Sequence, residues 1–476
     1  MSFIQRIARN TSIFFISQII SYVLTFFYTV YIARFLGADG YGILAFALAF
    51  SGIFSILADL GLNTLTVREL SKYKNLTKKY IGNVLAIKLI LACLSFGLII
   101  LSINLMRYPQ DIITVVYFVS LSVIITSIFG IFYSVFQAYE KMGYQSVGQI
   151  LTNISMFLGV LVGIYYGFNV IGFSLIYLIT SLIILLYCIV ICIWKFTRFK
   201  IEFDEHFWRS NFIEALPFGL TGISVMLYTY IDSVLLSVMQ GNEVVGWYNA
   251  AYRLVLFLVF IPVTINTTIF PVMSKFHLSS PSSLKLMNEK YFKFMIIIGI
   301  PLGIATTLLA DKIILLIFGT GYTQSITALQ ILIWTLVFTF GGASFVRLLE
   351  ATERQLVLSK ITGISVIINV VLNLILIPKF SLIGACIATV LTEIFLVSIV
   401  FKICYKLGYG IKIKKILADL LKIIFASLMM GFIIYYIKDL NLLIILIVSF
   451  IVYFVLLYLV GGIDKVDIKI IKEMIK

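Results

Sequence analysis

Long apolar runs separated by short polar connections dominate the chain. The first seven runs fall at about 11–33, 41–65, 81–104, 112–138, 147–167, 170–194 and 213–239, and the second seven at about 244–273, 292–310, 325–348, 356–377, 381–402, 416–437 and 441–461. A helix needs about 20 apolar residues to cross the roughly 30 Å hydrocarbon core of a bilayer. The pattern therefore predicts fourteen transmembrane helices. Continuous runs of this length exclude the short alternating strands of an outer-membrane barrel.

Composition supports the same fold class. Of the 476 residues, 62% are hydrophobic and 12% are charged, whereas water-soluble domains carry about 25% charged residues. The fourteen predicted spans leave too few residues for a soluble catalytic domain. The sequence also lacks the glycine-rich and histidine motifs of nucleotide or zinc enzymes. We therefore expect an all-α polytopic membrane protein that is not an enzyme.

The net charge of +15 is explained by membrane topology. Lys and Arg residues are about five times more frequent in one set of alternate connections than in the other, and cytoplasmic loops collect these residues. The asymmetry predicts a multi-pass protein of the plasma or inner membrane with both termini in the cytoplasm. It also removes the need to invoke a nucleic-acid partner.

Three short motifs recur in the same order and at nearly the same spacing in two halves of the chain. They are Gly37–Gly42 with Gly241–Gly246, Gln137–Lys141 with Glu350–Arg354, and Phe168–Gly172 with Phe380–Gly384. Such parallel repeats are typical of transporters in which one repeat rocks against the other. They predict an N-terminal lobe of six helices at 1–200, a second lobe of six at 201–410, and two extra helices with a cytoplasmic tail at 411–476.

The loop after the first span carries a family resemblance. The run from Ala33 to Gly42, the segment Ala58–Leu62 and the segments Ala215–Gly219, Tyr230–Asp232 and Gly246–Arg253 resemble the Wzx-like polysaccharide flippases of the multidrug/oligosaccharidyl-lipid/polysaccharide (MOP) exporter superfamily. The resemblance covers nearly the whole chain. It implies two lobes around a central cavity, alternating access, and a cargo of isoprenoid-diphosphate-linked oligosaccharide.

Charged and polar residues inside apolar spans are the candidate substrate ligands, because a charge in hydrocarbon is costly. Arg253 is the deepest cation, about 13 Å along its span, and a guanidinium can hold a phosphate by two parallel hydrogen bonds. An ion pair with Asp232 at similar depth is the equally weighted alternative. Lys88, Arg347 and Gln18 are further candidates, although Gln18 could equally bond to a neighbouring helix.

The resemblance to lipid II flippases implies a sodium site on three spans. Its residues here are Asp232, Asn369, Asn373 and Thr389, with Thr392 as an alternative and Glu393 as a further ligand. Asn373 stands where the relatives have a carboxylate, which weakens the case for sodium. The alternative is that these side chains form hydrogen bonds between helices. Na⁺ or H⁺ is the expected coupling ion, and no other cofactor is expected.

Asp59 lies within reach of Arg68 or Lys88 near the cytoplasmic end of the second span. The group forms either an inner gate, with Asp59 and Arg68 as its residues, or a simple salt bridge.

These observations predict a monomeric flippase of lipid-linked oligosaccharide, with that oligosaccharide and membrane lipid as its partners. The alternatives are a multidrug or cation antiporter of the same superfamily and a membrane polysaccharide polymerase or ligase. The antiporter should have an acidic cavity, and the polymerase should have a long outer loop.

Overall fold

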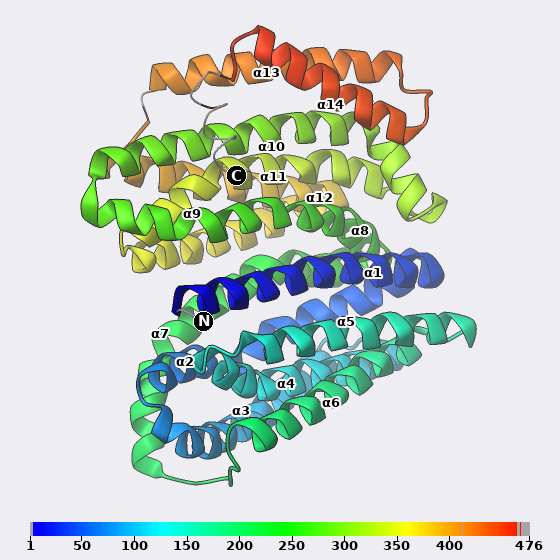
Figure 1. The fold of residues 1–476 in the computed structure, drawn as a ribbon. Coiled ribbons are helices and arrows are strands. Elements are labelled where there is room, and N and C mark those ends of the chain that lie inside the picture. The colour runs from blue at the N-terminus through cyan, green and yellow to red at the C-terminus, as the bar shows by residue number, and fades with distance from the viewer. Residues whose placement is uncertain (1–2, 412, 464–466, 468–476) are drawn as a thin grey trace. The chain divides into compact units, whose positions relative to one another are not determined.

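The computed structural model describes residues 3–411, 413–463 and 467, apart from the side chains of 3–15, 268 and 413–415. In this part of the chain every regular element is a helix (Figure 1). Twelve of the helices are long and apolar enough to cross a membrane. The all-α membrane fold predicted from the sequence is thus confirmed.

Two of these helices contain an internal break. The helix α1 (Phe3–Ser55) leaves helical geometry at Gly37, where φ is 69°, and α12 (Gln355–Cys404) does so at Ser381, where φ is 49°. Each break lies at or close to a junction between two of the predicted spans. Counting the two sides of each break separately makes the structure consistent with the fourteen predicted crossings.

The chain divides by packing into two compact units, and the first comprises Met1–Asn249. Besides α1 and the start of α8, its helices are α2 (Leu62–Lys72), α3 (Thr77–Leu105), α4 (Gln110–Ala138), α5 (Met142–Tyr165), α6 (Val170–Lys195) and α7 (Glu205–Gln240). The helix α4 packs against α1, α2, α3 and α6. Its side chains Phe132 and Phe136 are buried in the core of this unit.

The second unit comprises Ala250–Lys476. It contains the rest of α8 (Asn242–Leu258), then α9 (Phe260–Ser279), α10 (Pro281–Ile317), α11 (Ser325–Ala351), α12, α13 (Ile413–Tyr436) and α14 (Leu442–Leu459). The helix α11 packs between α10 and α12. The two C-terminal helices pair with each other, and α13 lies along α10 (Figure 1).

The backbone supports the internal repeat. Left-handed φ values, which L-residues rarely adopt, recur at matching places in the two halves: Gly37 and Gly241, Arg107 and Gly319, Glu140 and Glu353. The first and third pairs belong to motifs that the sequence repeats. The lobe boundaries at 200 and 410 stay predictions. The packing division falls later than 200, because α7 packs against α1 and α2.

Two predicted spans differ from the observed helices. The run 41–65 was predicted as one helix, but α1 ends at Ser55 and a 3₁₀ turn (Ile56–Ala58) follows. Leu60 and Gly61 then adopt φ values of 44° and 84°, so α2 starts as a separate helix. The run 244–273 is broken between α8 and α9 at Val259. Pro262 is the physical cause, because it has no N–H to donate to the carbonyl four residues earlier.

Candidate functional site

Asp232 is held in the first unit by a tyrosine. Its side chain is 5% exposed, and Tyr248 Oη donates a hydrogen bond of 2.8 Å to its Oδ2. Tyr248, at 1% exposure, comes from the start of α8, whereas Asp232 lies on α7. A buried tyrosine usually directs its hydroxyl to a polar partner, and here the partner is the one carboxylate that the sequence singled out on this helix.

A close backbone approach brings the start of α8 against α1. A Cβ at Gly42 would lie 1.8 Å from the carbonyl oxygen of Asn242, and one at Gly246 would lie 1.9 Å from that of Ala38. Both glycines belong to the repeated motif found in the sequence. Their lack of a side chain lets the two helices touch, and this contact fixes where Tyr248 meets Asp232.

Arg253 belongs to the second unit and is partly buried on α8. Asp232 belongs to the first unit. The ion pair between Arg253 and Asp232, like the contact of Arg253 with cargo, therefore stays a prediction.

Lys88 and Asp59 form a buried ion pair. Lys88 Nζ lies 2.7 Å from Asp59 Oδ1, with the lysine side chain 0% and the aspartate 19% exposed. The same ammonium donates to the carbonyl of Ser127 at 2.6 Å. Asp59 also accepts the backbone N–H groups of Gly61 and Asn63. The pair thus ties α3 and α4 to the turn between α1 and α2.

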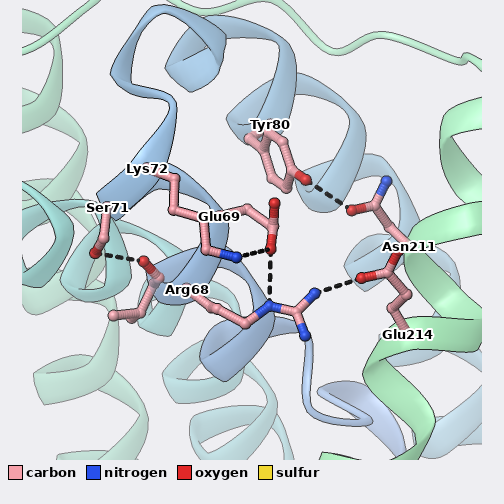
Figure 2. A network of polar contacts seen from close by, with 8 residues as sticks. Arg68, Glu69, Ser71, Lys72, Tyr80, Asn211 and Glu214 are labelled. Carbon is pink, nitrogen blue, oxygen red and sulfur yellow. Dashed lines mark hydrogen bonds and ion pairs between the residues drawn. The ribbon is translucent and has the colours of Figure 1, made fainter.

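The predicted gate partner Arg68 has different contacts from Asp59. Figure 2 shows its guanidinium between two carboxylates: Nε donates to Glu69 Oε1 at 2.7 Å, and Nη2 donates to Glu214 on α7. Beside it, Tyr80 Oη donates to Asn211 Oδ1 at 2.9 Å. These contacts join α2 and α3 to α7. Asp59 and Arg68 are therefore each paired elsewhere, and their role as a gate stays a prediction.

The loop before α7 is fastened to the start of α3. Lys79 Nζ lies 2.7 Å from Asp204 Oδ2, and Asp204 accepts the N–H of Phe207 as the N-cap of α7. The lysine contact and this capping bond lower the pKa of Asp204 below its ordinary value. Asn83 Oδ1 accepts both the Asp204 N–H and the indole N–H of Trp208.

Gln18 bonds to a neighbouring helix. Its Nε2 lies 3.5 Å from Gln149 Oε1 on α5, which is longer than a usual hydrogen bond of about 2.7–3.2 Å. The contact corresponds to the second of the two roles predicted for this residue, while contact with cargo remains untested.

The polar residues of α12 lie on both sides of its break. Asn369 and Asn373 are buried, and Asn373 Nδ2 donates to Asn369 Oδ1 at 3.0 Å. After the break, Thr389 donates to the carbonyl of Ala385. Glu393 accepts a 2.8 Å hydrogen bond from Thr339 on α11. These are contacts within and between helices of the second unit. The predicted cation site, which also needs Asp232 from the first unit, stays a prediction.

Arg347 lies at the cytoplasmic end predicted for α11. Its Nη1 is 2.5 Å from Glu350 Oε2, and the two side chains are 31% and 22% exposed. A carboxylate one turn away therefore occupies part of the guanidinium that was predicted to contact substrate.

Sequence reasoning missed the partners Tyr248, Glu214 and Thr339. Tyr248 lies inside a segment that carries the family resemblance. A tyrosine in an apolar span needs a polar partner for its hydroxyl, and this need could have indicated the contact with Asp232. Glu214 and Thr339 gave no signal, because their contacts join helices far apart in the chain. A fourth missed residue is Asp467, which is fully buried between Lys290 and Lys293 at 2.6 Å from each.

Two solved structures have the same fold as this chain. The lipid II flippase MurJ in an inward closed conformation aligns with a TM-score of 0.74 at 18% identity, covering 93% of this chain and 97% of that one. A multidrug resistance MATE family transporter of the MOP superfamily, in an inward-facing conformation, aligns with a TM-score of 0.66 at 15% identity over 80% and 92%. This chain therefore shares its fold with both of these solved structures.

The chain belongs to the polysaccharide biosynthesis protein family, whose model matches residues 7–277. The MatE family model also matches residues 217–375. The membership confirms the resemblance seen in the sequence.

Three named relatives are similar over different lengths. The probable low-salt glycan biosynthesis flippase Agl15 of Haloferax volcanii is 23% identical, covering 81% of each chain. The capsular polysaccharide biosynthesis protein CapF of Staphylococcus aureus is 23% identical over 81% of this chain and 96% of that one. An uncharacterized membrane protein of Methanocaldococcus jannaschii, MJ1068, is 28% identical, and the match spans about half of its length, 54%.

Proposed function

We propose that this protein is a flippase that moves an isoprenoid-diphosphate-linked oligosaccharide from the inner to the outer leaflet for surface polysaccharide synthesis. The observation that carries the proposal is the family match over residues 7–277. Relatives named as a glycan flippase, a capsular polysaccharide protein and a putative O-antigen transporter of Shigella flexneri support it. The repeated backbone geometry of the two halves suits alternating access.

The proposed setting is the plasma or inner membrane, with both termini in the cytoplasm and the protein acting as a monomer. The Lys and Arg asymmetry supports this orientation. Cargo binding must differ between the inward-open and outward-open states, because only such a difference moves the equilibrium between them.

Arg253 is the proposed diphosphate ligand because it is the cation predicted deepest in an apolar span. Lys88, Arg347 and Gln18 are further candidates. Na⁺ or H⁺ is the proposed coupling ion, bound through Asp232 together with the polar residues of α12. The buried position of Asn369 and Asn373 supports a role inside the protein.

The test uses purified protein in proteoliposomes with a fluorescent lipid-linked oligosaccharide. Arg253→Ala should abolish flipping. Arg253→Lys should retain part of it, because the charge stays but the paired hydrogen bonds are lost. Arg198→Ala, in an exposed loop, is the control and should behave as wild type. Normal flipping by Arg253→Ala would remove the cargo role of this residue. Absence of flipping by correctly inserted wild type, with every candidate cargo, would contradict the function.

A second candidate is a multidrug or cation antiporter, which the MatE match over residues 217–375 favours. Efflux of ethidium from the same proteoliposomes, driven by a sodium or proton gradient, distinguishes the two. We expect no such efflux, because the deep cation Arg253 disfavours a cationic drug.

A further inference from the structure

An apolar groove of about 280 Å³ lies between α3 and the start of α7. Its lining residues are Ile87, Ile90 and Leu91 from α3, and Trp208, Arg209 and Phe212 from α7. Residues three and four apart share one face of a helix, so each helix turns a single apolar stripe toward the groove. Arg209 is the one charged residue among the six.

We expect the groove to open near the membrane boundary, because its α7 residues precede the predicted span 213–239. Trp208 and Arg209 lie about one turn inside α7, which begins at Glu205. The indole N–H of Trp208 donates to Asn83 Oδ1 at 3.1 Å, so its polar edge is fixed while its ring lines the groove. Tryptophan combines a polar N–H with an apolar ring, and it is therefore enriched at the interface between lipid and water. Ile87, Ile90 and Leu91 lie progressively further along α3.

Arg209 differs from two cations that lie close to the start of α7, because both of these are paired. Lys79 is paired with Asp204, and Arg68 is paired with Glu69 and Glu214. The exposed side chain of Arg209 has no ion pair or hydrogen bond within the described part of the chain. A guanidinium keeps its charge and matches the geometry of a phosphate, so an anion from outside the protein can bind here without displacing a partner.

We propose that this groove binds one anionic glycerophospholipid, with an acyl chain along the α3 and α7 stripes and the phosphodiester on Arg209. Charge selects this occupant: one guanidinium matches one phosphodiester, and an apolar floor takes a hydrocarbon chain. The Lys and Arg asymmetry places this end of both helices at the cytoplasmic leaflet, which carries the anionic lipids. The lipid would hold the start of α7 against α3, beside the loop that Lys79 and Asp204 fasten.

This site is separate from the cargo ligand proposed above, so its test does not depend on transport. The full chain is purified in detergent, and binding of phosphatidylglycerol and of phosphatidylcholine is measured by native mass spectrometry and by the shift in thermal unfolding temperature. Wild type should bind phosphatidylglycerol more tightly. Arg209→Gln should weaken that binding about tenfold, since a hydrogen bond to a charged group is lost.

Two variants control for other causes. Ile90→Trp fills the groove from a position that is already 46% exposed, so it should fold normally and lose phosphatidylglycerol binding with Arg209 intact. Lys78→Gln removes an exposed cation from the first turn of α3 and should bind like wild type. If Lys78→Gln and Arg209→Gln lose phosphatidylglycerol binding equally, the attraction is unspecific and the proposal is overturned.

Three further outcomes also overturn it. The first is equal binding of phosphatidylglycerol and phosphatidylcholine by wild type. The second is an equal shift in unfolding temperature with inorganic phosphate alone, which would make Arg209 an ion site rather than a lipid site. The third is tighter Arg209-dependent binding of a polyprenyl diphosphate than of phosphatidylglycerol, which would make the groove a cargo site.

Discussion

The ion pair between Lys88 and Asp59 permits a quantitative test of what holds the first unit together. Lys88 is 0% exposed, and its ammonium contacts the Asp59 carboxylate at 2.7 Å and the Ser127 carbonyl at 2.6 Å. Asp59→Ala leaves that ammonium buried with a carbonyl as its remaining contact. Removing one partner of a buried pair costs about 3–5 kcal/mol, because the other charge stays uncompensated. We expect a destabilisation of this size.

The reverse substitution should cost less. In Lys88→Met the Asp59 side chain, which is 19% exposed, keeps the N–H groups of Gly61 and Asn63 at 3.2 and 3.3 Å. We expect a loss of about 1–3 kcal/mol. The double variant Asp59→Asn with Lys88→Met replaces both charges by neutral groups of similar size. Such replacements of buried pairs are often close to neutral, so the double variant should be more stable than Asp59→Ala.

The measurement is a double-mutant cycle, obtained from reversible unfolding in mixed micelles. It compares wild type, the single variants Asp59→Asn and Lys88→Met, and their double variant. Asp59→Ala is measured in the same assay. We expect a coupling energy of about 2–3 kcal/mol. Lys78→Met, at an exposed position on the same helix, controls for loss of a lysine and should be neutral. The reasoning fails if Asp59→Ala costs less than about 1 kcal/mol, or if the effects of the two single substitutions simply add.

Three further predictions concern other contacts of the first unit. Gly246→Ala should prevent correct folding, measured as loss of monodisperse protein, because its Cβ would meet a backbone oxygen at 1.9 Å, whereas Gly97→Ala, with nothing within 4 Å, should be neutral. Tyr248→Phe should cost about 1.5–3 kcal/mol in the same unfolding assay by removing the 2.8 Å hydrogen bond to Asp232; stability equal to wild type would contradict this. The pKa of Asp204 is lowered in the folded protein. Its ionised carboxylate therefore stabilises the fold at pH values above its unfolded pKa of about 3.9, and this stabilisation is lost as the pH falls through the pKa of the folded state. Asp204→Asn should therefore flatten the acid limb of a stability profile, and an unchanged limb would refute the assignment.

Transmembrane architecture could be predicted from the sequence because lipid imposes a local rule. Every span must be apolar over about 20 residues, and that rule can be read without knowing the neighbours. The same holds for the repeat, since the glycine at 37 and its counterpart Gly241 mark the same left-handed backbone. The end of the second span was predicted wrongly. Leu60 and Leu62 continue the apolar pattern, although the positive φ values of Leu60 and Gly61 make a turn there.

The candidate site could be predicted only in part. Asp232, Asp59 and Lys88 stood out because ionisable residues in apolar runs are rare, and this signal is local. Their partners Tyr248 and Ser127 come from other helices, and so does the Glu214 that binds Arg68. No local pattern specifies which of several polar residues a given helix face will meet.

The fold class, the repeat, the family and the short list of buried charges can thus be read from the amino-acid sequence, because each rests on apolarity or motifs along the chain. The pairing of those charges, the broken helices, and the groove between α3 and α7 that Arg209 helps to line became visible in the folded structure. The physical reason is that hydrogen bonds and ion pairs act over about 3 Å between atoms, and packing brings those atoms together from positions that lie far apart in the chain.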